Sequence, residues 1–62
     1  MVLEEILRQE TGMILNRKIP KAIELNYSTY CELIKEIGAS RYFSQLHGIN
    51  ILITNTNRII VR

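Results

Sequence analysis

The hydrophobic positions of this chain alternate with the period of a β-strand in its last third. Residues 49–53 read Ile-Asn-Ile-Leu-Ile and residues 58–62 read Arg-Ile-Ile-Val-Arg, on either side of the polar segment 54–57. Short β-branched runs bounded by Asn and Thr are typical of strands joined by a turn. The pattern therefore predicts a C-terminal antiparallel hairpin.

The length of the hairpin loop decides which side chains share a face, because directly opposed residues point to the same side of a sheet. An even loop would mix apolar and basic residues on both faces. A three-residue loop over 55–57, with Asn57 in the left-handed conformation that Asn tolerates, separates them. We therefore expect a single apolar core face that contains Ile49, Ile51, Ile53, Ile59 and Val61.

The same register places Leu52 opposite Ile60 on the other face. An apolar centre with a polar rim that contains arginine is typical of a small interface. Strand addition along 58–62 would also satisfy the outer backbone groups of the terminal strand. The alternative is that the N-terminal helix or the Met13–Leu15 segment covers the pair within the same chain. The predicted interface residues are Leu52, Ile60, Arg58, Arg62 and Asn50.

The first half of the chain predicts a short helix and a strand. The segment from Val2 to about Glu10 has the period of an amphipathic helix. Thr11-Gly12 predicts its end, because Gly tolerates the left-handed conformation that ends helices. Met13–Leu15 is compatible with a strand or with more helix. The segment Ile19–Leu25 looks extended, and its second half alternates as a half-buried strand does.

The strongest helix is predicted from Tyr27 to Ile37, where apolar residues recur at helical spacing. Asn26 is its expected N-cap and Gly38 its expected end. A further short helix is predicted from Ser40 to Leu46. The expected fold is one small α+β domain over residues 1–62, of order α-β-α-(short α)-β-β, with the C-terminal antiparallel hairpin packed on the 27–37 helix.

Composition limits the classes of function. A chain of 62 residues is near the lower size limit for a domain that folds alone, so self-association or docking is the expected source of further stability. One cysteine excludes an internal disulfide and a four-thiolate metal site. The net charge of +2 is too small to indicate nucleic-acid binding. No apolar run approaches the ~20 residues of a membrane span, and the N-terminus lacks the basic start of a signal peptide. We expect an intracellular protein, cytoplasmic or virion-associated.

Candidate catalytic chemistry is sparse. Cys31 and His47 are the single residues of their types. Neither belongs to a pattern that would supply a nucleophile, a base and an orienting group. The sequence also lacks a phosphate-binding glycine loop and any metal-ligand spacing. We therefore expect a non-enzymatic protein with no cofactor and no metal.

Residues 32–41, Glu-Leu-Ile-Lys-Glu-Ile-Gly-Ala-Ser-Arg, resemble the helix, turn and second-helix start of winged helix-turn-helix regulators. The C-terminal hairpin would then be the wing, and Arg58 would contact a phosphate. The would-be recognition helix over 40–46 is short and carries one basic residue, Arg41. Recognition helices normally present several polar side chains to base edges. A winged-helix DNA-binding regulator is therefore an alternative.

A second pattern spans most of residues 19–61. Its segments are Ile19-Pro20, Ile23-Glu24-Leu25-Asn26, Tyr30, Leu33-Ile34, Leu46-His47-Gly48-Ile49 and Arg58-Ile59-Ile60-Val61. The pattern resembles one common in structural proteins of tailed bacteriophages. In those proteins a strand leads into a Tyr-x-x-Leu helix, followed by an apolar-x-Gly-Ile/Leu step and a terminal strand or hairpin.

This resemblance implies a virion or mobile-element origin. The main expectation is a phage-type structural or assembly protein that acts through protein–protein contacts, as a homo-oligomer or docked on a larger structural protein. A small inhibitor of a host enzyme is a further alternative, because it would use the same kind of contact surface.

Overall fold

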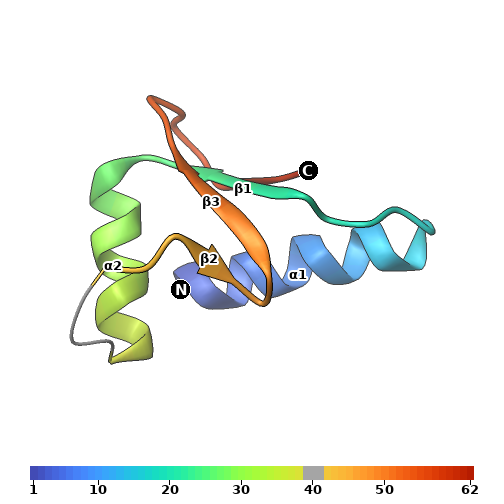
Figure 1. The fold of residues 1–62 in the computed structure, drawn as a ribbon, viewed down its shortest axis with the longest axis horizontal. Helices are drawn as coiled ribbons and strands as arrows, with labels where there is room; N and C mark the ends of the chain where they lie inside the picture. The colour runs from blue at the N-terminus through green and yellow to red at the C-terminus, as the bar shows by residue number, and fades with distance from the viewer. Residues whose placement is uncertain (39–41) are drawn as a thin grey trace.

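The computed structural model describes residues 1–38 and 42–62. The elements of this described part are α1 (Val2–Leu15), β1 (Ala22–Leu25), α2 (Tyr27–Ile37), β2 (Gln45–Leu46), β3 (Ile49–Ile53) and β4 (Ile60–Val61). The strands form one mixed sheet in the order β2-β3-β1-β4. Figure 1 shows α1 along the long axis of the molecule and α2 across one end. The α+β class predicted from the sequence is confirmed.

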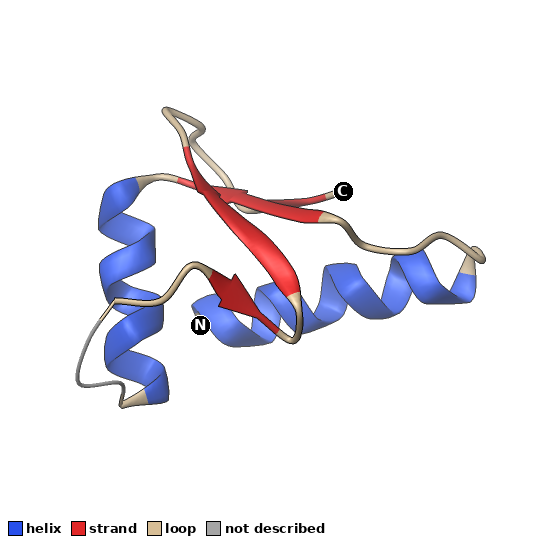
Figure 2. Ribbon diagram, in the orientation of Figure 1, coloured by secondary structure: helices blue, strands red, loops and turns tan. Residues whose placement is uncertain are grey.

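The hydrophobic core lies between the sheet and both helices. Its fully buried side chains are Ile6, Ile23, Leu25 and Leu33. Ile23 of β1 is in register with Ile51 of β3 and with Val61 of β4, so these three side chains lie on one face of the sheet. Because α1 and α2 both contribute to this core, they cover the same face. No described helix covers the opposite face (Figure 2).

The two C-terminal strands form, but the predicted pairing between them is wrong. Strand β1 lies between them, parallel to β3 and antiparallel to β4. β1 is the shorter, second half of the predicted strand Ile19–Leu25. Its Ile23 and Leu25 are fully buried, and a central position gives its backbone hydrogen-bond partners on both sides. The predicted alignment of Ile51 with Val61 still holds, because Ile23 lies between them in the same row.

The connection between β3 and β4 crosses to the far side of β1 and is not a tight turn. The predicted left-handed conformation of Asn57 is therefore wrong. Among the described residues other than glycine, positive φ angles occur at Arg17 and His47. A crossing connection does not require a left-handed residue, whereas a three-residue hairpin loop usually does.

A hairpin forms one step earlier in the chain, between β2 and β3. The register pairs Leu46 with Ile49, so His47 and Gly48 make a two-residue turn. Both turn residues have positive φ, 54° at His47 and 75° at Gly48. A type I′ turn requires positive φ at both central residues and matches the twist of the flanking strands. The sequence signal for this turn was Gly48 directly after the polar His47.

Residues 42–46 are not helical, so the short helix predicted from Ser40 to Leu46 does not form over this range. These residues lead into β2 and include it. The Tyr30 hydroxyl of α2 donates to the Phe43 carbonyl at 2.5 Å and accepts from the Phe43 N–H at 2.9 Å. Tyr30 thus provides the hydrogen bonds that a helical turn would have supplied. Residues 39–41 lie outside the described part of the chain.

Helix α2 is confirmed at both ends. The Asn26 side chain accepts a hydrogen bond from the Thr29 N–H at 2.8 Å. Gly38 is left-handed, with φ 78°, and donates to the Ile34 carbonyl at 3.0 Å. The Asn26 amide also donates to the Thr56 carbonyl at 3.1 Å. The cap of α2 therefore fixes the connection between β3 and β4 as well.

Helix α1 continues through Gly12, past its predicted end. A helix-interior Gly costs about 1 kcal/mol relative to Ala, and this cost is offset because Met13 packs against the core. The helix ends at a Schellman motif, in which Lys18 N–H donates to the Met13 carbonyl and Arg17 N–H donates to the Ile14 carbonyl. The segment after Gly12, for which the sequence allows a strand or a helix, is helical.

The first turn of α1 is capped by a residue of α2. The Glu36 carboxylate accepts the Val2 N–H at 2.8 Å and the Leu3 N–H at 3.1 Å. Met1, at the N-cap position, makes no side-chain hydrogen bond to the helix. The two N–H groups favour the charged carboxylate and so lower the pKa of Glu36 below its ordinary value of 4.5.

This cap predicts acid sensitivity of the fold. Because the pKa of Glu36 is lower in the folded chain than in the unfolded chain, its contribution to stability is present above about pH 4.5 and is lost as the pH falls through the folded pKa. Glu36→Gln should lower the free energy of unfolding at neutral pH and reduce its further loss on acidification, measured by urea denaturation at several pH values. Glu32→Gln, on the same helix, is the control. Equal acid sensitivity in wild type and Glu36→Gln would contradict the cap.

Candidate interaction surface

The face of the sheet without a helix is built from the residues that alternate with the core. Leu52 of β3, Glu24 of β1 and Ile60 of β4 form one row across three strands. Leu52 is 41% exposed and Ile60 is half-buried. Since neighbouring strands lie about 4.8 Å apart, Leu52 and Ile60 are roughly 10 Å apart. The predicted direct contact between Leu52 and Ile60 is wrong, because Glu24 separates them.

Polar contacts fix the remaining side chains of this face. The Arg62 guanidinium forms an ion pair with the Glu24 carboxylate. At the β2 edge, the Gln45 amide donates to the Asn50 side-chain oxygen at 3.0 Å. The helix-free face, as we call it, consists of Ala22, Glu24, Gln45, Asn50, Leu52, Ile60 and Arg62. Four predicted interface residues, Leu52, Ile60, Arg62 and Asn50, therefore share one surface.

Arg58, the fifth predicted interface residue, borders other surfaces. It lines a cleft of about 460 Å³ together with Glu5, Arg8 and Gln9 of α1. It also lines a smaller cleft of about 280 Å³ beside the first residues of α1 and the first turn of α2. The chain bends between residues 57 and 58, so the strand alternation that placed Arg58 beside Ile60 does not extend that far.

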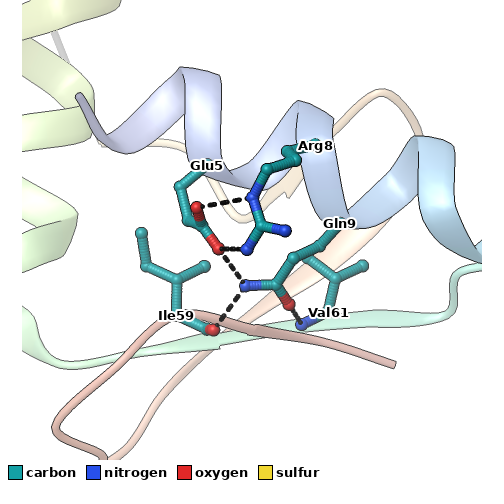
Figure 3. A network of polar contacts seen from close by, with 5 residues as sticks. All are labelled: Glu5, Arg8, Gln9, Ile59 and Val61. Carbon is teal, nitrogen blue, oxygen red and sulfur yellow. Dashed lines mark hydrogen bonds and ion pairs between the residues drawn. The ribbon is translucent and has the colours of Figure 1, made fainter.

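The outer edge of β4 is occupied by a side chain that the sequence did not single out. The Gln9 amide of α1 donates to the Ile59 carbonyl at 2.7 Å and accepts from the Val61 N–H at 2.8 Å (Figure 3). A residue of a parallel strand paired with Ile60 would make the same two bonds. Strand addition along 58–62 is therefore obstructed at its centre, which argues against that part of the sequence prediction.

An ion pair orients the Gln9 amide. The Gln9 amide nitrogen also donates to the Glu5 carboxylate at 2.7 Å, and Arg8 donates to both oxygens of the same carboxylate (Figure 3). The Arg8 guanidinium, followed by the Gln9 amide, lowers the pKa of Glu5 to about 2. Glu5 therefore remains a charged acceptor at neutral pH. This keeps the nitrogen of Gln9 toward Ile59 and its oxygen toward Val61.

Cys31 and His47, the candidate chemical residues, have different neighbours. His47 lies in the β2–β3 turn with its Nδ1 3.5 Å from Oε2 of the buried Glu10. Cys31 lies in α2 one turn after Tyr27. A hydrogen bond with the Tyr42 hydroxyl, and to a smaller extent Cys31, raises the pKa of Tyr27 to about 12. Within the described residues, no three His, Cys, Asp or Glu side chains are grouped so as to hold a metal ion.

The winged-helix alternative loses part of its recognition element. Residues 42–46 are not helical, and β2 occupies the end of that segment. Arg41, the basic residue of the would-be recognition helix, lies outside the described residues. Arg58, expected to contact a phosphate from the wing, lines clefts beside α1.

Neither helix of the described part combines the length and the apolar character needed to cross a membrane. Comparison of the chain with protein families, with curated proteins and with solved structures finds no match. Inference about function therefore depends on the surfaces of the chain itself. The most defined of these is the helix-free face.

The Gln9 contacts predict a test of the β4 edge. Gln9→Met keeps the stem of the side chain and removes the amide, leaving the Ile59 carbonyl and the Val61 N–H without this partner. We expect the free energy of unfolding to fall by about 1–3 kcal/mol. Arg8→Met, which removes the exposed ion pair with Glu5, should cost less than about 1 kcal/mol. The measurement is urea denaturation. A larger loss for Arg8→Met than for Gln9→Met would refute the ranking.

Proposed function

We propose that this chain is a non-enzymatic structural or assembly protein that acts by binding protein through its helix-free face. The partner is a second copy of the chain or a larger structural protein. The supporting observation is the row of Leu52, Glu24 and Ile60 on a sheet face that no described helix covers. A sheet face with an exposed apolar side chain gains free energy when a partner removes that side chain from water.

The composition of the helix-free face favours specific binding over non-specific hydrophobic association. Glu24 lies between the two apolar side chains of the row, and Arg62, its ion-pair partner, lies beside the row. Its charges are held in place before binding, so a partner needs matched polar groups to avoid leaving either charge unpaired. In a two-fold contact, Leu52 of one copy would lie against Ile60 of the other, and the Glu24–Arg62 ion pairs of both copies would lie between these two apolar contacts.

The bacteriophage part of the proposal rests on the sequence pattern across residues 19–61. In support of the proposal, strand β1 leads into the helix that contains Tyr30 and Leu33, and β3 begins at Ile49, directly after Gly48. We infer a virion-associated or cytoplasmic site of action. Genes for capsid, portal or tail proteins next to the coding sequence would support this origin, and a genomic setting without any such gene would argue against it.

Leu52→Asp tests the face directly. The chain offers a matched control in Ile37→Asp on α2, because Ile37 and Leu52 are equally exposed, at 41%. In sedimentation velocity, we expect the wild-type and Ile37→Asp proteins to have masses above the 7.2 kDa of one chain. The Leu52→Asp protein should have the mass of a single chain, because a carboxylate buried in the contact without a partner is strongly unfavourable.

Two outcomes would contradict the proposed self-association. One is a wild-type chain that remains at 7.2 kDa at every concentration tested. The other is equal dissociation by Leu52→Asp and Ile37→Asp, which would show that the effect is not specific to the helix-free face. Circular dichroism of each variant checks that the fold is retained. Unfolding by Leu52→Asp would place Leu52 in the core and refute the assigned face.

A further inference from the structure

The C-terminal end of α1 and its connection to β1 project beyond the sheet along the long axis of the molecule (Figure 1). Three large aliphatic side chains are exposed there, at 63% for Ile14 and 79% for both Leu15 and Ile19. Three cationic side chains lie between and after them in the sequence. We call this surface the α1 tip, and it consists of Ile14, Leu15, Arg17, Lys18, Ile19 and Lys21.

The backbone of the α1 tip is held in one shape. The Schellman motif folds the chain back at Arg17, which has a φ of 60°. This left-handed conformation is unfavourable for a residue with a side chain, and Gly usually occupies it. At the other end, the N–H groups of Lys21 and Ala22 both donate to the Arg62 carbonyl at 2.7 Å. The exposed side chains are therefore displayed on a preformed turn, which lowers the entropic cost of binding.

The cations of the α1 tip are free to bind acidic groups. Arg17, Lys18 and Lys21 form no ion pair within the described part of the chain. Most carboxylates of the chain already have partners. Glu5 contacts Arg8, Glu24 contacts Arg62, Glu36 caps α1 and Glu10 is buried beside His47. A second copy of the chain thus offers little opposing charge, and contact between two such tips would bring like charges together.

The combination of aliphatic and cationic side chains at the α1 tip favours some classes of partner over others. A nucleic-acid backbone would pair with the three cations but would leave three large aliphatic side chains in water. A membrane surface would attract the same cations and aliphatic side chains, but segments that bind there usually also carry aromatic side chains at the headgroup level, and the α1 tip contains none. A protein pocket with an apolar floor and carboxylates at its border matches both kinds of side chain.

We propose that the α1 tip docks into an apolar pocket bordered by carboxylates on a different protein. This contact goes beyond the proposed function, because it uses a surface separate from the helix-free face. One copy can therefore associate with another through the sheet and hold a second protein at the α1 tip.

The test uses a random-peptide display library as the probe. Peptides are selected on the full chain and counter-selected on the double variant Leu15→Ser with Ile19→Ser. Because both side chains are 79% exposed, these changes should leave the fold intact. We expect the selected peptides to combine Asp or Glu with large apolar residues. A synthetic copy should shift the amide resonances of residues 14–21 in NMR spectra and bind Leu15→Ser about tenfold more weakly.

Charge and surface controls complete the test. Arg17→Glu with Lys18→Glu should weaken the peptide by at least tenfold, with a loss that shrinks as salt is added. Leu52→Asp should leave peptide binding unchanged, and Leu15→Ser should leave the oligomeric state unchanged, so failure of one surface is distinguishable from failure of the other. The proposal is overturned if the selected peptides lack acidic residues or shift resonances elsewhere. Tip-dependent binding to phosphatidylglycerol vesicles or duplex DNA that is tighter than to any selected peptide would also overturn it.

Discussion

The position of β1 at the centre of the sheet is the constraint on which the rest of the structure depends. Its Ile23 and Leu25 are fully buried, and both helices pack on the face that they define. Pairing with β3 on one side and β4 on the other joins segments from both halves of the chain. Because that face packs against the helices in the core, the alternate residues of all four strands must form the helix-free face. The candidate surface is thus a geometric consequence of how the core is built.

Side-chain alternation predicted the rows of the sheet but not its strand order. It aligned Ile51 with Val61 correctly, and β1 then enters between them without changing any row. The alternation of side chains along a strand determines which face of the sheet each residue occupies. It does not determine which other strand lies next to that strand. The cap at Asn26 and the end at Gly38 were predictable because both act within a few residues. The bonds from Gln9 to Ile59 and Val61 span about fifty positions and left no local signal.

The two edge strands of the sheet, β4 and β2, are protected in different ways. At β4, the Gln9 amide takes the hydrogen-bonding positions that a neighbouring strand would use. At the other edge, β2 is two residues long and ends in the His47-Gly48 turn, and short edge strands offer little to pair with. Strand addition at β4 and β2 is therefore disfavoured, and both of the proposed contacts use side-chain surfaces, the helix-free face and the α1 tip.

The cap that Glu36 places on α1 has a consequence for motion. The last turn of α2 and the first turn of α1 are the parts of each helix that would normally fray first. Here the Val2 and Leu3 amides are bonded to Glu36, so fraying of either turn removes a partner from the other. The two helix ends should open together as one cooperative unit, even though more than thirty residues separate them along the chain. Amide exchange at the start of α1 would then report on the end of α2.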